Sequence, residues 1–510
     1  MYIIIILNNF QAEGQVYILS VNFRDVLNFI RAKGENPEIR VKSQDNFDVK
    51  ISEVISDSRN VTEGTLFACI KGEISDGHKF VSMAESNGAC ALLCEHEVDS
   101  SLPQIIVKRV RDHLGEISSL VYDNPSAKLL MVGITGTNGK TTTSYITRSI
   151  LQAAGIRTGL LGTIIESDGV TDKEADRTTP ESCIVQRQLS HMVKNHCGAC
   201  VMETSSHGLY LGRLKGALYD VPVFTNLYPE HLDFHKDMEN YFAAKKLLFT
   251  DYTKENFCGA VNFDDSYGRR LADEFGDKVR GFGFTDGASS RVIEARTSIN
   301  GTDIVIDAEG FGRLSLHTPL VGDFNIMNTL CAVTAMRGRV DDDAIVQGVA
   351  NVPLVPGRLE RIDLPNGACV FVDFAHTPSA LRSVLGVIRK LSGNERRIIS
   401  MFGHGGGRYQ KNRPELGRAA SEFADEVFIT SDNAREEDPY EIAYSIAEGV
   451  RKPYRVNTDR PQAVNIALDS LKPGDILVIT GKGPERFITI KDNKIPFNDA
   501  EAVKAWRDSH

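Results

Sequence analysis

The sequence predicts an α/β protein of three domains: a smaller N-terminal α/β domain, a central P-loop domain with a parallel sheet, and a C-terminal Rossmann-like domain. Three observations lead to this prediction. The chain has 510 residues, too many for one ordinary hydrophobic core. Short apolar runs alternate with segments of helical periodicity, as in sheets built from strand–helix–strand units. A glycine-rich segment around Gly136 has the composition of a phosphate-binding turn.

We place the domains at residues 1–122, 123–354 and 355–510. The first region alternates short strands with helices and has no phosphate-binding motif. Pro353 to Gly357 punctuates the chain as a linker would. The apolar strands expected beyond it are Ala368 to Val372, Arg397 to Met401, Glu426 to Thr430 and Asp475 to Thr480.

Composition and charge narrow the class of protein. A hydrophobic content of 42% and a charged content of 25% are typical of a soluble globular chain. The net charge of −10 argues against a nucleic-acid partner. The apolar start, Tyr2 to Leu7, is too short for a signal peptide or a membrane span, so we expect an extra strand or a disordered start there. The expected location is cytoplasmic, without membrane insertion.

The nine cysteines lie mostly in apolar runs, such as those ending at Cys69 and Cys94. In a large intracellular chain they are best interpreted as small buried hydrophobic residues. Cys197 and Cys200 have C-x-x-C spacing, but without a second pair a zinc site there is a weak alternative.

The central motif reads Gly-Ile-Thr-Gly-Thr-Asn-Gly-Lys-Thr-Thr from Gly133 to Thr142. The apolar run Leu129 to Ile134 precedes it as a buried strand, and Thr141 to Ala154 follows with helical spacing and a stop at Gly155. Such a turn offers backbone N–H groups and a helix N-terminus to an anion, a mobile lysine charge, and a threonine hydroxyl for Mg²⁺. Five residues rather than the usual four separate the first glycine from the Gly-Lys pair. The motif predicts binding of ATP or GTP.

Two further polar segments follow apolar runs and are therefore expected at the carboxyl ends of parallel strands, where ligands bind. Glu203 comes after Ala199 to Val201 and is a candidate Mg²⁺ ligand, with a solvated loop glutamate as the alternative. Thr225-Asn226-Leu227 follows the apolar run Val221 to Phe224.

A separate segment, Glu230 to His235, contains four ionisable groups in six residues, which indicates metal or phosphate chemistry or, on composition alone, an ordinary polar loop.

Taken together and in order, the motifs resemble those of the Mur ligases, ATP-dependent amide-forming enzymes of peptidoglycan precursor synthesis. The resemblance extends from Asp57-Ser58-Arg59 to Gly481-Lys-Gly-Pro-Glu485 and so covers nearly the whole chain. The motifs between these ends are Gly136-Thr-Asn-Gly-Lys-Thr141, Thr178-Thr-Pro-Glu-Ser182, Met202-Glu-Thr-Ser-Ser-His207, Thr225-Asn-Leu, His231-Leu-Asp-Phe-His235, Tyr241-Phe-Ala-Ala-Lys245, Gly322-Asp-Phe-Asn325, Asn328, Pro356-Gly-Arg-Leu-Glu360 and Asp373-Phe-Ala-His-Thr-Pro378.

Within the family, the resemblance is to the branch that adds a third amino acid to UDP-N-acetylmuramoyl-L-alanyl-D-glutamate. It implies that the N-terminal domain holds the UDP-sugar, the central domain holds ATP and Mg²⁺, and the C-terminal domain brings the amino acid. It also implies a role in cell wall biogenesis, cell shape and cell division. The implied nucleotide positions are Gly136, Thr137, Asn138, Gly139, Lys140, Thr141, Thr142, Asn325, Asn328 and Arg358. The implied positions for the UDP-sugar peptide are Ser58, Thr178, Thr179, Ser205 and Arg213.

The resemblance gives catalytic roles to Lys140, Lys245 and His231, and metal-binding roles to Thr141, Glu203, Lys245 and His231. Lys245 stands where the family has a carbamylated lysine. A free ammonium would repel the metal, whereas a carbamate offers oxygen ligands to a hard cation. Without the family context, an exposed helix lysine would be the plainer interpretation.

The chain departs from the family pattern at several positions. Leu211 replaces a polar residue that usually contacts substrate, Glu230 replaces Asp, Glu63 replaces Pro, and Phe374 replaces Tyr. None of these changes removes a group that the mechanism requires.

The acceptor motif indicates which amino acid is added. Arg408, Asp432, Asn433, Arg435, Gly481 and Glu485 resemble the site of members that add meso-diaminopimelate, although Ala434 replaces the usual proline. Arginine can grip the distal carboxylate that lysine lacks, and a glutamate suits the distal ammonium. The alternative for Arg435 is a surface ion pair with Glu436 or Glu437.

Other functions remain open at this stage. L-lysine or L-ornithine could be the acceptor. A folylpolyglutamate synthetase shares the central fold, although the Thr178–Ser182 stretch and the domain with Asp57-Ser58-Arg59 disfavour that function. A nonenzymatic nucleotide switch would need only the phosphate-binding motif.

Overall fold

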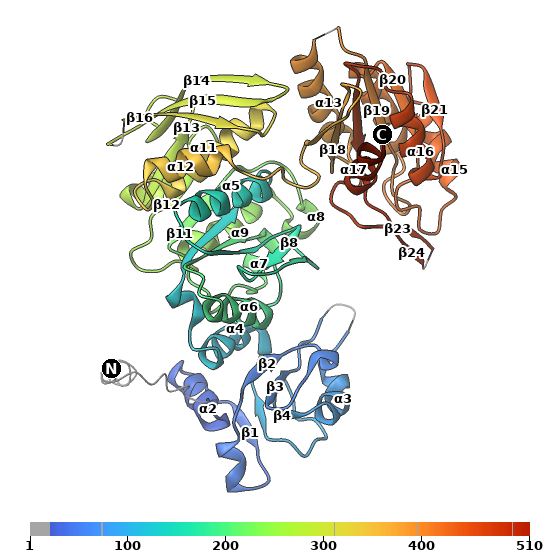
Figure 1. Ribbon diagram of the computed structural model, residues 1–510. Helices are drawn as coiled ribbons and strands as arrows, with labels where there is room; N and C mark the ends of the chain where they lie inside the picture. Colours follow the sequence, from blue (N-terminus) through green and yellow to red (C-terminus); the bar gives the residue numbers. More distant parts are fainter. Residues whose placement is uncertain (1–20, 73–74, 311, 394, 492) are drawn as a thin grey trace. The chain divides into compact units, whose positions relative to one another are not determined.

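The computed structural model describes residues 21–72, 75–310, 312–393, 395–491 and 493–510 (Figure 1). The start of the chain, Tyr2 to Leu7, lies outside these residues. The chain forms two compact units. The first comprises the residues up to Lys128 with Glu181–His191 and Leu211–Ala217, and the second comprises Leu129–Pro180, Met192–Tyr210 and Leu218–His510.

The first unit contains a five-stranded sheet in which all pairs are parallel except the edge pair β1–β5. Its strand order is β1 (Glu38–Arg40), β5 (Gln104–Ile106), β4 (Ala89–Cys94), β3 (Thr65–Ala68) and β2 (Glu53–Ile55). Its helices are α2 (Phe23–Ala32), α3 (Val81–Ser86) and α4 (Val110–Val121), and α6 (Ser182–Lys194) begins in this unit. Apolar side chains of these helices and of the strands form its core.

The larger sheet of the second unit has eleven strands and carries the phosphate-binding motif. Its order is β16 (Gly312–Thr318), β15 (Gly301–Ala308), β14 (Ser290–Ser298), β13 (Val279–Gly283), β12 (Gly259–Asn262), β11 (Val221–Phe224), β6 (Leu130–Thr135), β10 (Ala199–Glu203), β7 (Thr158–Leu161), β8 (Ile165–Ser167) and β9 (Asp172–Glu174). The strands from β14 to β7 run parallel, and antiparallel strands extend both edges. The carboxyl ends of β6, β10 and β11 therefore meet at one edge of the parallel sheet.

Helix α5 (Lys140–Ala153) starts directly after the phosphate-binding turn. Its sequence is rich in threonine, a weak helix former, so packing rather than propensity stabilises it. Ile146, Ile150 and Leu151 are fully buried in the core between this helix and the sheet. The other helices around this sheet are α7 (Ser206–Tyr210), α8 (Leu232–His235), α9 (Met238–Thr250), α10 (Ser266–Phe275), α11 (Asp323–Met336) and α12 (Asp342–Ala350).

The C-terminal part of the second unit has a six-stranded sheet of its own, parallel except at β17 (Figure 1). Its order is β17 (Glu360–Asp363), β18 (Cys369–Asp373), β22 (Ile476–Thr480), β19 (Ile398–Phe402), β20 (Glu426–Ile429) and β21 (Tyr454–Val456). Separate apolar clusters lie on its two faces, one with α13 (Pro378–Ser392), α14 (Asn412–Phe423) and α15 (Pro439–Ala447), the other with α16 (Arg460–Asp469) and α17 (Asp499–Ser509). A hairpin of β23 (Phe487–Ile490) and β24 (Asn493–Pro496) follows β22. This doubly wound arrangement places ligand-binding loops at the carboxyl ends of the strands.

The α/β class and the largely parallel sheets are confirmed. The strand expected from Leu129 to Ile134 is β6, and the helix expected from Thr141 is α5, each within one residue of the predicted start. The boundaries at residues 122 and 354 stay a prediction.

Candidate active site

The turn between β6 and α5 requires glycine at two positions. Gly136 and Gly139 have φ angles of 146° and 87°. A Cβ at Gly136 would lie 1.9 Å from Thr225 Oγ1, and one at Gly139 would lie 2.3 Å from Asn328 Oδ1. Gly133 has a different role, because it lies within β6 and its Cβ would meet the Tyr219 ring at 2.7 Å. The unusual spacing of the motif therefore reflects a packing glycine in the strand, and the turn itself spans Gly136 to Gly139.

Residues that follow β11 hold this turn in place. Asn226 Oδ1 accepts from the Asn138 N–H at 2.9 Å, and Asn226 Nδ2 donates to the Asn138 carbonyl at 3.2 Å. Thr225 Oγ1 donates to the same carbonyl at 2.6 Å. The Thr137 N–H donates to the Asn226 carbonyl at 2.9 Å. The phosphate-binding turn is thus fixed before any nucleotide arrives, as a preorganised anion site requires.

The Lys140 ammonium lies over this turn. Its Nζ donates to the carbonyls of Gly136 at 2.8 Å and Thr137 at 2.9 Å. Burial lowers the pKa of Lys140, an effect that the Glu203 carboxylate opposes. A phosphate group placed on the turn would lie within reach of this side chain.

Glu203 is fully buried at the end of β10, directly beside the start of α5. Its carboxylate accepts from Thr141 Oγ1 at 3.0 Å, from the Thr163 N–H at 2.8 Å and from Thr163 Oγ1 at 2.9 Å. Among the described residues it forms no ion pair with a lysine or arginine. A buried carboxylate without a cationic partner, beside a hydroxyl oxygen, fits the oxygen ligands that Mg²⁺ prefers.

Lys245 lies on α9 and is 1% exposed. Its Nζ donates to the Gly136 carbonyl at 2.8 Å and lies 4.6 Å from the centre of the Tyr241 ring. Burial, followed by the charge of Lys140, holds the pKa of Lys245 well below its usual range. The interpretation of Lys245 as an exposed helix lysine is therefore wrong.

Three histidines gather beside Lys245. The ring of His207 lies 4.9 Å from that of His231 and 5.3 Å from that of His235, measured between centroids. His235 Nε2 and Ser206 Oγ are hydrogen-bonded at 3.0 Å. Burial, then the positive charges of its neighbours, lowers the pKa of His235 to about 4. His231 has a left-handed backbone with φ of 56° and a half-exposed side chain, so it faces solvent rather than the core.

Two asparagines of α11 are among the positions that the resemblance implies for the nucleotide. Asn325 Nδ2 donates to the Val321 carbonyl at 2.8 Å, and Asn325 Oδ1 accepts from Asn328 Nδ2 at 2.9 Å. This chain of bonds aims Asn328 Oδ1 at Gly139. Arg358, the third implied nucleotide residue, lies over the Phe374 ring at 5.7 Å.

The residues implied for the UDP-sugar peptide fall in both units. In the second unit, Thr178 Oγ1 is hydrogen-bonded to Thr163 Oγ1 at 3.1 Å, and Thr179 Oγ1 accepts from the Ser205 N–H at 3.0 Å. In the first unit, Ser58 is buried after β2, and Arg213 pairs with Glu181 at 3.2 Å. Each unit thus presents part of the expected set.

A polar network occupies the carboxyl ends of β20 and β22 in the C-terminal domain. Asn433 Nδ2 donates to Glu485 Oε2 at 2.9 Å. Lys482, fully buried, donates to the same Glu485 oxygen at 2.8 Å and lies 3.9 Å from Asp432. Gly481 has φ of 106°, and a Cβ there would lie 3.0 Å from Asp432 Oδ2. Four of the predicted acceptor residues are therefore brought together.

Arg435 and Arg408 are exposed beside this network. Arg435 has φ of 53°, and its backbone bonds to Thr489 and Lys491. Its Nη1 donates to the Gly406 carbonyl at 2.9 Å, and Glu437 pairs with Arg413 instead. Among the described residues Arg435 forms no ion pair, which contradicts the surface-pair alternative.

Comparison with known proteins identifies the family. Residues 50–122 match the Mur ligase family catalytic domain, residues 134–336 the Mur ligase middle domain, and residues 357–483 the Mur ligase glutamate ligase domain. A UDP-N-acetylmuramoyl-L-alanyl-D-glutamate–2,6-diaminopimelate ligase 1 of Clostridium acetobutylicum is 37% identical over 468 residues, covering 90% of this chain and 95% of the relative. The ligase of the same description from Aquifex aeolicus is 37% identical over 457 residues, with coverages of 89% and 93%. The chain belongs to the Mur ligase family.

Solved structures agree with this assignment. A structure of UDP-N-acetylmuramoyl-L-alanyl-D-glutamate–2,6-diaminopimelate ligase superposes with a TM-score of 0.69 at 26% identity, covering 96% of this chain and 99% of the other. The fold alone is shared with a Mycobacterium tuberculosis folylpolyglutamate synthase, with a TM-score of 0.57 at 18% identity over 71% of this chain and 91% of that chain. This Mur ligase is an ATP-dependent ligase. The nonenzymatic nucleotide switch is therefore excluded.

Sequence reasoning missed several residues of this Mur ligase site. Thr163 holds Glu203 with two bonds, His207 lies against both His231 and His235, and Lys482 bonds to Glu485 in the acceptor network. His207, His235 and Lys482 lie inside motifs that were recognised, so their ionisable side chains were the available signal. Thr163 lies in the short loop between β7 and β8, where nothing in the sequence distinguishes it.

The departures from the family pattern have mild consequences in this Mur ligase. Phe374 keeps an aromatic face under Arg358. Glu230 lies 3.9 Å from His231, close enough for the longer carboxylate to pair with that ring.

Among the described helices, none has the length and apolar composition that a membrane crossing needs.

Proposed function

We propose that this Mur ligase joins meso-diaminopimelate to the D-glutamate of UDP-N-acetylmuramoyl-L-alanyl-D-glutamate, converting ATP to ADP and phosphate. The names of the relatives describe this substrate pair. The reaction belongs to peptidoglycan precursor synthesis, and through it to cell wall biogenesis, cell shape and cell division. L-lysine, L-ornithine and folate are the alternative substrates.

One observation carries the chemistry: Lys140 and Lys245 donate to the same carbonyl, that of Gly136, each at 2.8 Å. Their nitrogens therefore lie within twice that distance of each other. Two ammonium groups so close, one of them buried, repel strongly. The arrangement favours a neutral Lys245 amine beside the charged Lys140.

A neutral amine is the form that reacts with carbon dioxide. The Lys245 nitrogen forms a bond to the carbon of CO₂, and one proton leaves, so that a carbamate anion replaces the amine. The repulsion between two cations becomes an attraction between Lys140 and an anion. Carbamylated Lys245 then offers oxygen atoms near the phosphate-binding turn.

In the first chemical step, a carboxylate oxygen of the D-glutamate attacks the γ-phosphorus of ATP. The bond between the γ-phosphorus and the β,γ-bridging oxygen breaks. ADP departs, and the D-glutamate side chain is left as an acyl phosphate. Lys140, which faces the turn, neutralises charge on the transferring phosphoryl group. The acceptor amine then attacks the acyl carbon, phosphate leaves, and the amine loses one proton.

Mg²⁺ fits this site because Thr141 and Glu203 present adjacent oxygen atoms, with carbamylated Lys245 and His231 as further candidate ligands. When bound, it would neutralise phosphate charge. Asn325, Asn328 and Arg358 are proposed to hold the nucleotide. Ser58, Thr178, Thr179, Ser205 and Arg213 are proposed to hold the UDP-sugar peptide.

The acceptor network supports diaminopimelate over lysine. Arg435 and Arg408 supply guanidinium groups that can bind the distal carboxylate bidentately. Asn433 and Glu485, bonded to each other, are placed to accept the distal ammonium with Asp432. Lysine would bring only an ammonium into a region that already holds Arg435, Arg408 and buried Lys482.

The test measures ADP release with the UDP-sugar dipeptide and meso-diaminopimelate, L-lysine or L-ornithine as acceptor. We expect rapid release with meso-diaminopimelate and release at background level without an amine. Tetrahydrofolate with L-glutamate serves as the alternative donor and acceptor pair. Turnover with that pair alone would refute the proposal.

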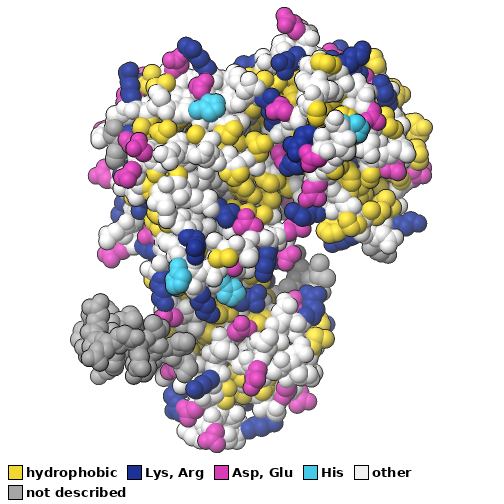
Figure 2. Space-filling model, viewed as in Figure 1, with side chains coloured by type: hydrophobic (Ala, Val, Ile, Leu, Met, Phe, Trp, Pro, Cys, Tyr) yellow, Lys and Arg dark blue, Asp and Glu magenta, His cyan; other side chains and the backbone are white. Residues whose placement is uncertain are grey.

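We also propose a cytoplasmic location without a nucleic-acid partner. The cysteines of the described chain are free thiols, as in a reducing compartment. Figure 2 shows acidic and basic side chains interspersed on the visible face of the described residues rather than gathered into a basic stripe.

A further inference from the structure

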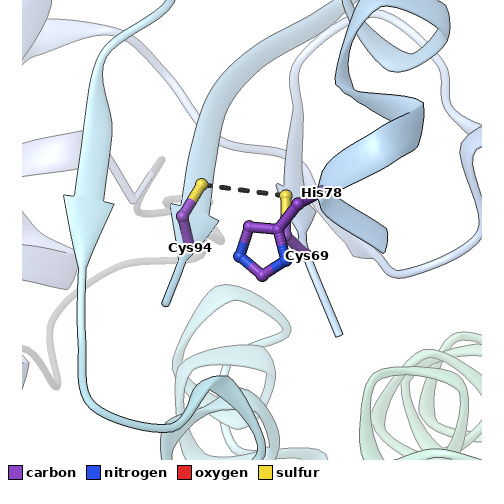
Figure 3. A group of neighbouring side chains, drawn as sticks. All are labelled: Cys69, His78 and Cys94. Atoms are coloured by element: carbon purple, nitrogen blue, oxygen red, sulfur yellow. Dashed lines mark hydrogen bonds between the residues drawn. The ribbon is translucent and has the colours of Figure 1, made fainter. Parts of the chain in front are cut away.

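We propose that the N-terminal domain binds one thiophilic cation, such as Zn²⁺, through Cys69, His78 and Cys94. The ligand atoms of these three side chains lie within 4.8 Å of one another (Figure 3). Cys69 and Cys94 are fully buried, and the His78 side chain is 5% exposed. The site is separate from the phosphate-binding turn and from the acceptor network.

The two sulfur atoms are spaced as a tetrahedral metal site requires. Their separation is 3.7 Å. Two thiolates bound to one Zn²⁺ at about 2.3 Å with a tetrahedral angle lie about 3.8 Å apart. A disulfide would instead bring the sulfurs to about 2.0 Å. The observed spacing matches metal coordination without movement of either strand.

Backbone register produces this spacing. Cys69 follows β3, Cys94 ends β4, and the paired residues before them are Ala68 and Leu93. The Cys69 N–H donates to the Leu93 carbonyl at 2.9 Å, so the two strands are still joined at the site. The two thiols are therefore held by the sheet and not by a mobile loop.

His78 is oriented as a metal-bound histidine usually is. Its Nδ1 and Asp76 Oδ1 are hydrogen-bonded at 2.7 Å, which leaves Nε2 as the acceptor nitrogen. Nε2 now accepts from the Glu95 N–H at 3.0 Å, a bond that metal binding would replace. The Asp76 and Glu95 carboxylates add negative charge around the site, which favours a cation.

Metal binding leaves the net charge of this buried site unchanged. Each thiol loses a proton to solvent as its sulfur bonds to the cation, and the His78 ring donates a nitrogen lone pair. One Zn²⁺ with two thiolates has no net charge, so the complex avoids the cost of burying an unpaired ion. A fourth position is left for water.

The metal would join the ends of β3 and β4 to the short helix η3 (Gly77–Phe80), which leads into α3. That segment contacts Ser58, because Ser58 Oγ donates to Met83 Sδ at 3.3 Å and Asn87 Nδ2 donates to the Ser58 carbonyl at 2.9 Å. We therefore assign the cation a structural role, fixing the loop edge on which Ser58 lies. This consequence rests on the function proposed above, whereas metal binding itself does not.

The experiment uses the reduced full-length protein, freed of metal by a chelator and then titrated with Zn²⁺ and, separately, Co²⁺. We expect one equivalent of Zn²⁺ bound and a thiolate-to-Co²⁺ charge-transfer band. The double variant Cys69→Ala/Cys94→Ala should lose both, and Asp76→Asn should weaken binding by about 10- to 100-fold. The matched control Cys200→Ala/Cys331→Ala removes two buried thiols of the central domain and should bind like the wild type.

The Co²⁺ band separates this site from any cation held by the oxygen and histidine ligands near the phosphate-binding turn, which give no thiolate signal. A hydrogen-exchange measurement should also show slower exchange at residues 77–87 on Zn²⁺ addition. Two outcomes would overturn the proposal. In the first, the wild type binds Co²⁺ without a thiolate band. In the second, the wild type as isolated shows two fewer free thiols than its nine cysteines, and it binds no metal after reduction.

Discussion

Replacing Arg435 by alanine should remove most of the preference for meso-diaminopimelate over L-lysine. Arg435 already has a left-handed backbone, with φ of 53°, so alanine inherits the same backbone strain and adds none. The backbone bonds to Thr489 and Lys491 do not involve the side chain. The substitution therefore changes the guanidinium and leaves the fold of the loop as it is.

The size of the effect follows from the contacts of this side chain. Within the described chain, only Nη1 of the guanidinium donates to another residue, the Gly406 carbonyl at 2.9 Å. The remaining donors can bind a carboxylate with two charge-assisted bonds, each contributing about 1.5–3 kcal/mol. Because Arg435 is exposed without ligand, we take the lower end, about 3 kcal/mol in total. This corresponds to a loss of about 10²-fold in kcat/KM for diaminopimelate.

The assay compares kcat/KM for both amino acids in the wild type, Arg435→Ala and Arg435→Lys. Efficiency with lysine should change little in the alanine variant, because lysine has no distal carboxylate. Arg435→Lys should fall between the other two, since an ammonium keeps the charge but not the fork. The matched control is Arg455→Ala, which removes an exposed arginine of β21 that pairs with Glu426, and it should behave like the wild type. An equal loss with both amino acids, or a wild type without preference, would refute the reasoning.

Three further predictions concern the central domain. Lys140→Ala should lower kcat by at least about 10²-fold without unfolding the protein, because the side chain bonds only to the turn. Circular dichroism measures the fold of the variant and ADP release measures its turnover. Normal turnover would contradict the assignment of Lys140. Lys245 should give a carbamate signal in ¹³C NMR after addition of labelled bicarbonate. The signal should be absent in Lys245→Ala but kept in Lys246→Ala, because Lys246 is half-buried and pairs with Glu274; a signal that survives Lys245→Ala would place the carbamate elsewhere. The pKa of His235 is about 4 in the folded state and about 6.5 in the unfolded state. The contribution of neutral His235 to the free energy of unfolding is therefore fully present above pH 6.5, and this free energy falls by about 3 kcal/mol as the pH drops to 4. Urea unfolding should show this slope in the wild type and in His317→Gln but not in His235→Gln, and a slope unchanged in the latter would exclude His235 as its source.

The sequence predicted best those parts of the fold that depend on continuous apolar runs. Val221 to Phe224 coincides with β11, because a strand buried on both faces needs apolar residues at every position. The strands β14 to β16 at one edge of the larger sheet were not predicted, since they are half-exposed and their apolar residues are interrupted by charged ones. The set of chain segments that form the first unit was not predictable either, because Glu181–His191 and Leu211–Ala217 join it from a distant part of the sequence.

The candidate site shows the same division between local and long-range information. Gly136, Gly139 and Lys140 could be placed from one motif, because the turn, the cap and the charge are neighbours in sequence. The shared carbonyl of Lys140 and Lys245 could not, since it depends on how α9 packs against the turn. The resemblance supplied Lys245 as a position, and the structure shows that burial, followed by the charge of Lys140, lowers the pKa of this amine.

The thiol pair of the N-terminal domain depends on a single irregularity in strand pairing. Thr65 is paired with Ala89, but Leu66 is paired with Ala91, so Cys90 is skipped and every later pair shifts by one residue. If Cys90 were instead paired with Leu66, Cys69 would lie opposite Leu93, and because alternate residues of a strand point to opposite faces, the Cys94 sulfur would move away from it. Two cysteines in separate apolar runs therefore look like ordinary core residues in the sequence. Deleting Cys90 tests this register directly. The remaining residues keep their partners, so Cys94 stays beside Cys69 and Zn²⁺ binding should be kept. Loss of the thiolate-to-Co²⁺ band in that variant, with an unchanged circular dichroism spectrum, would show that pairing register is not what places the ligands.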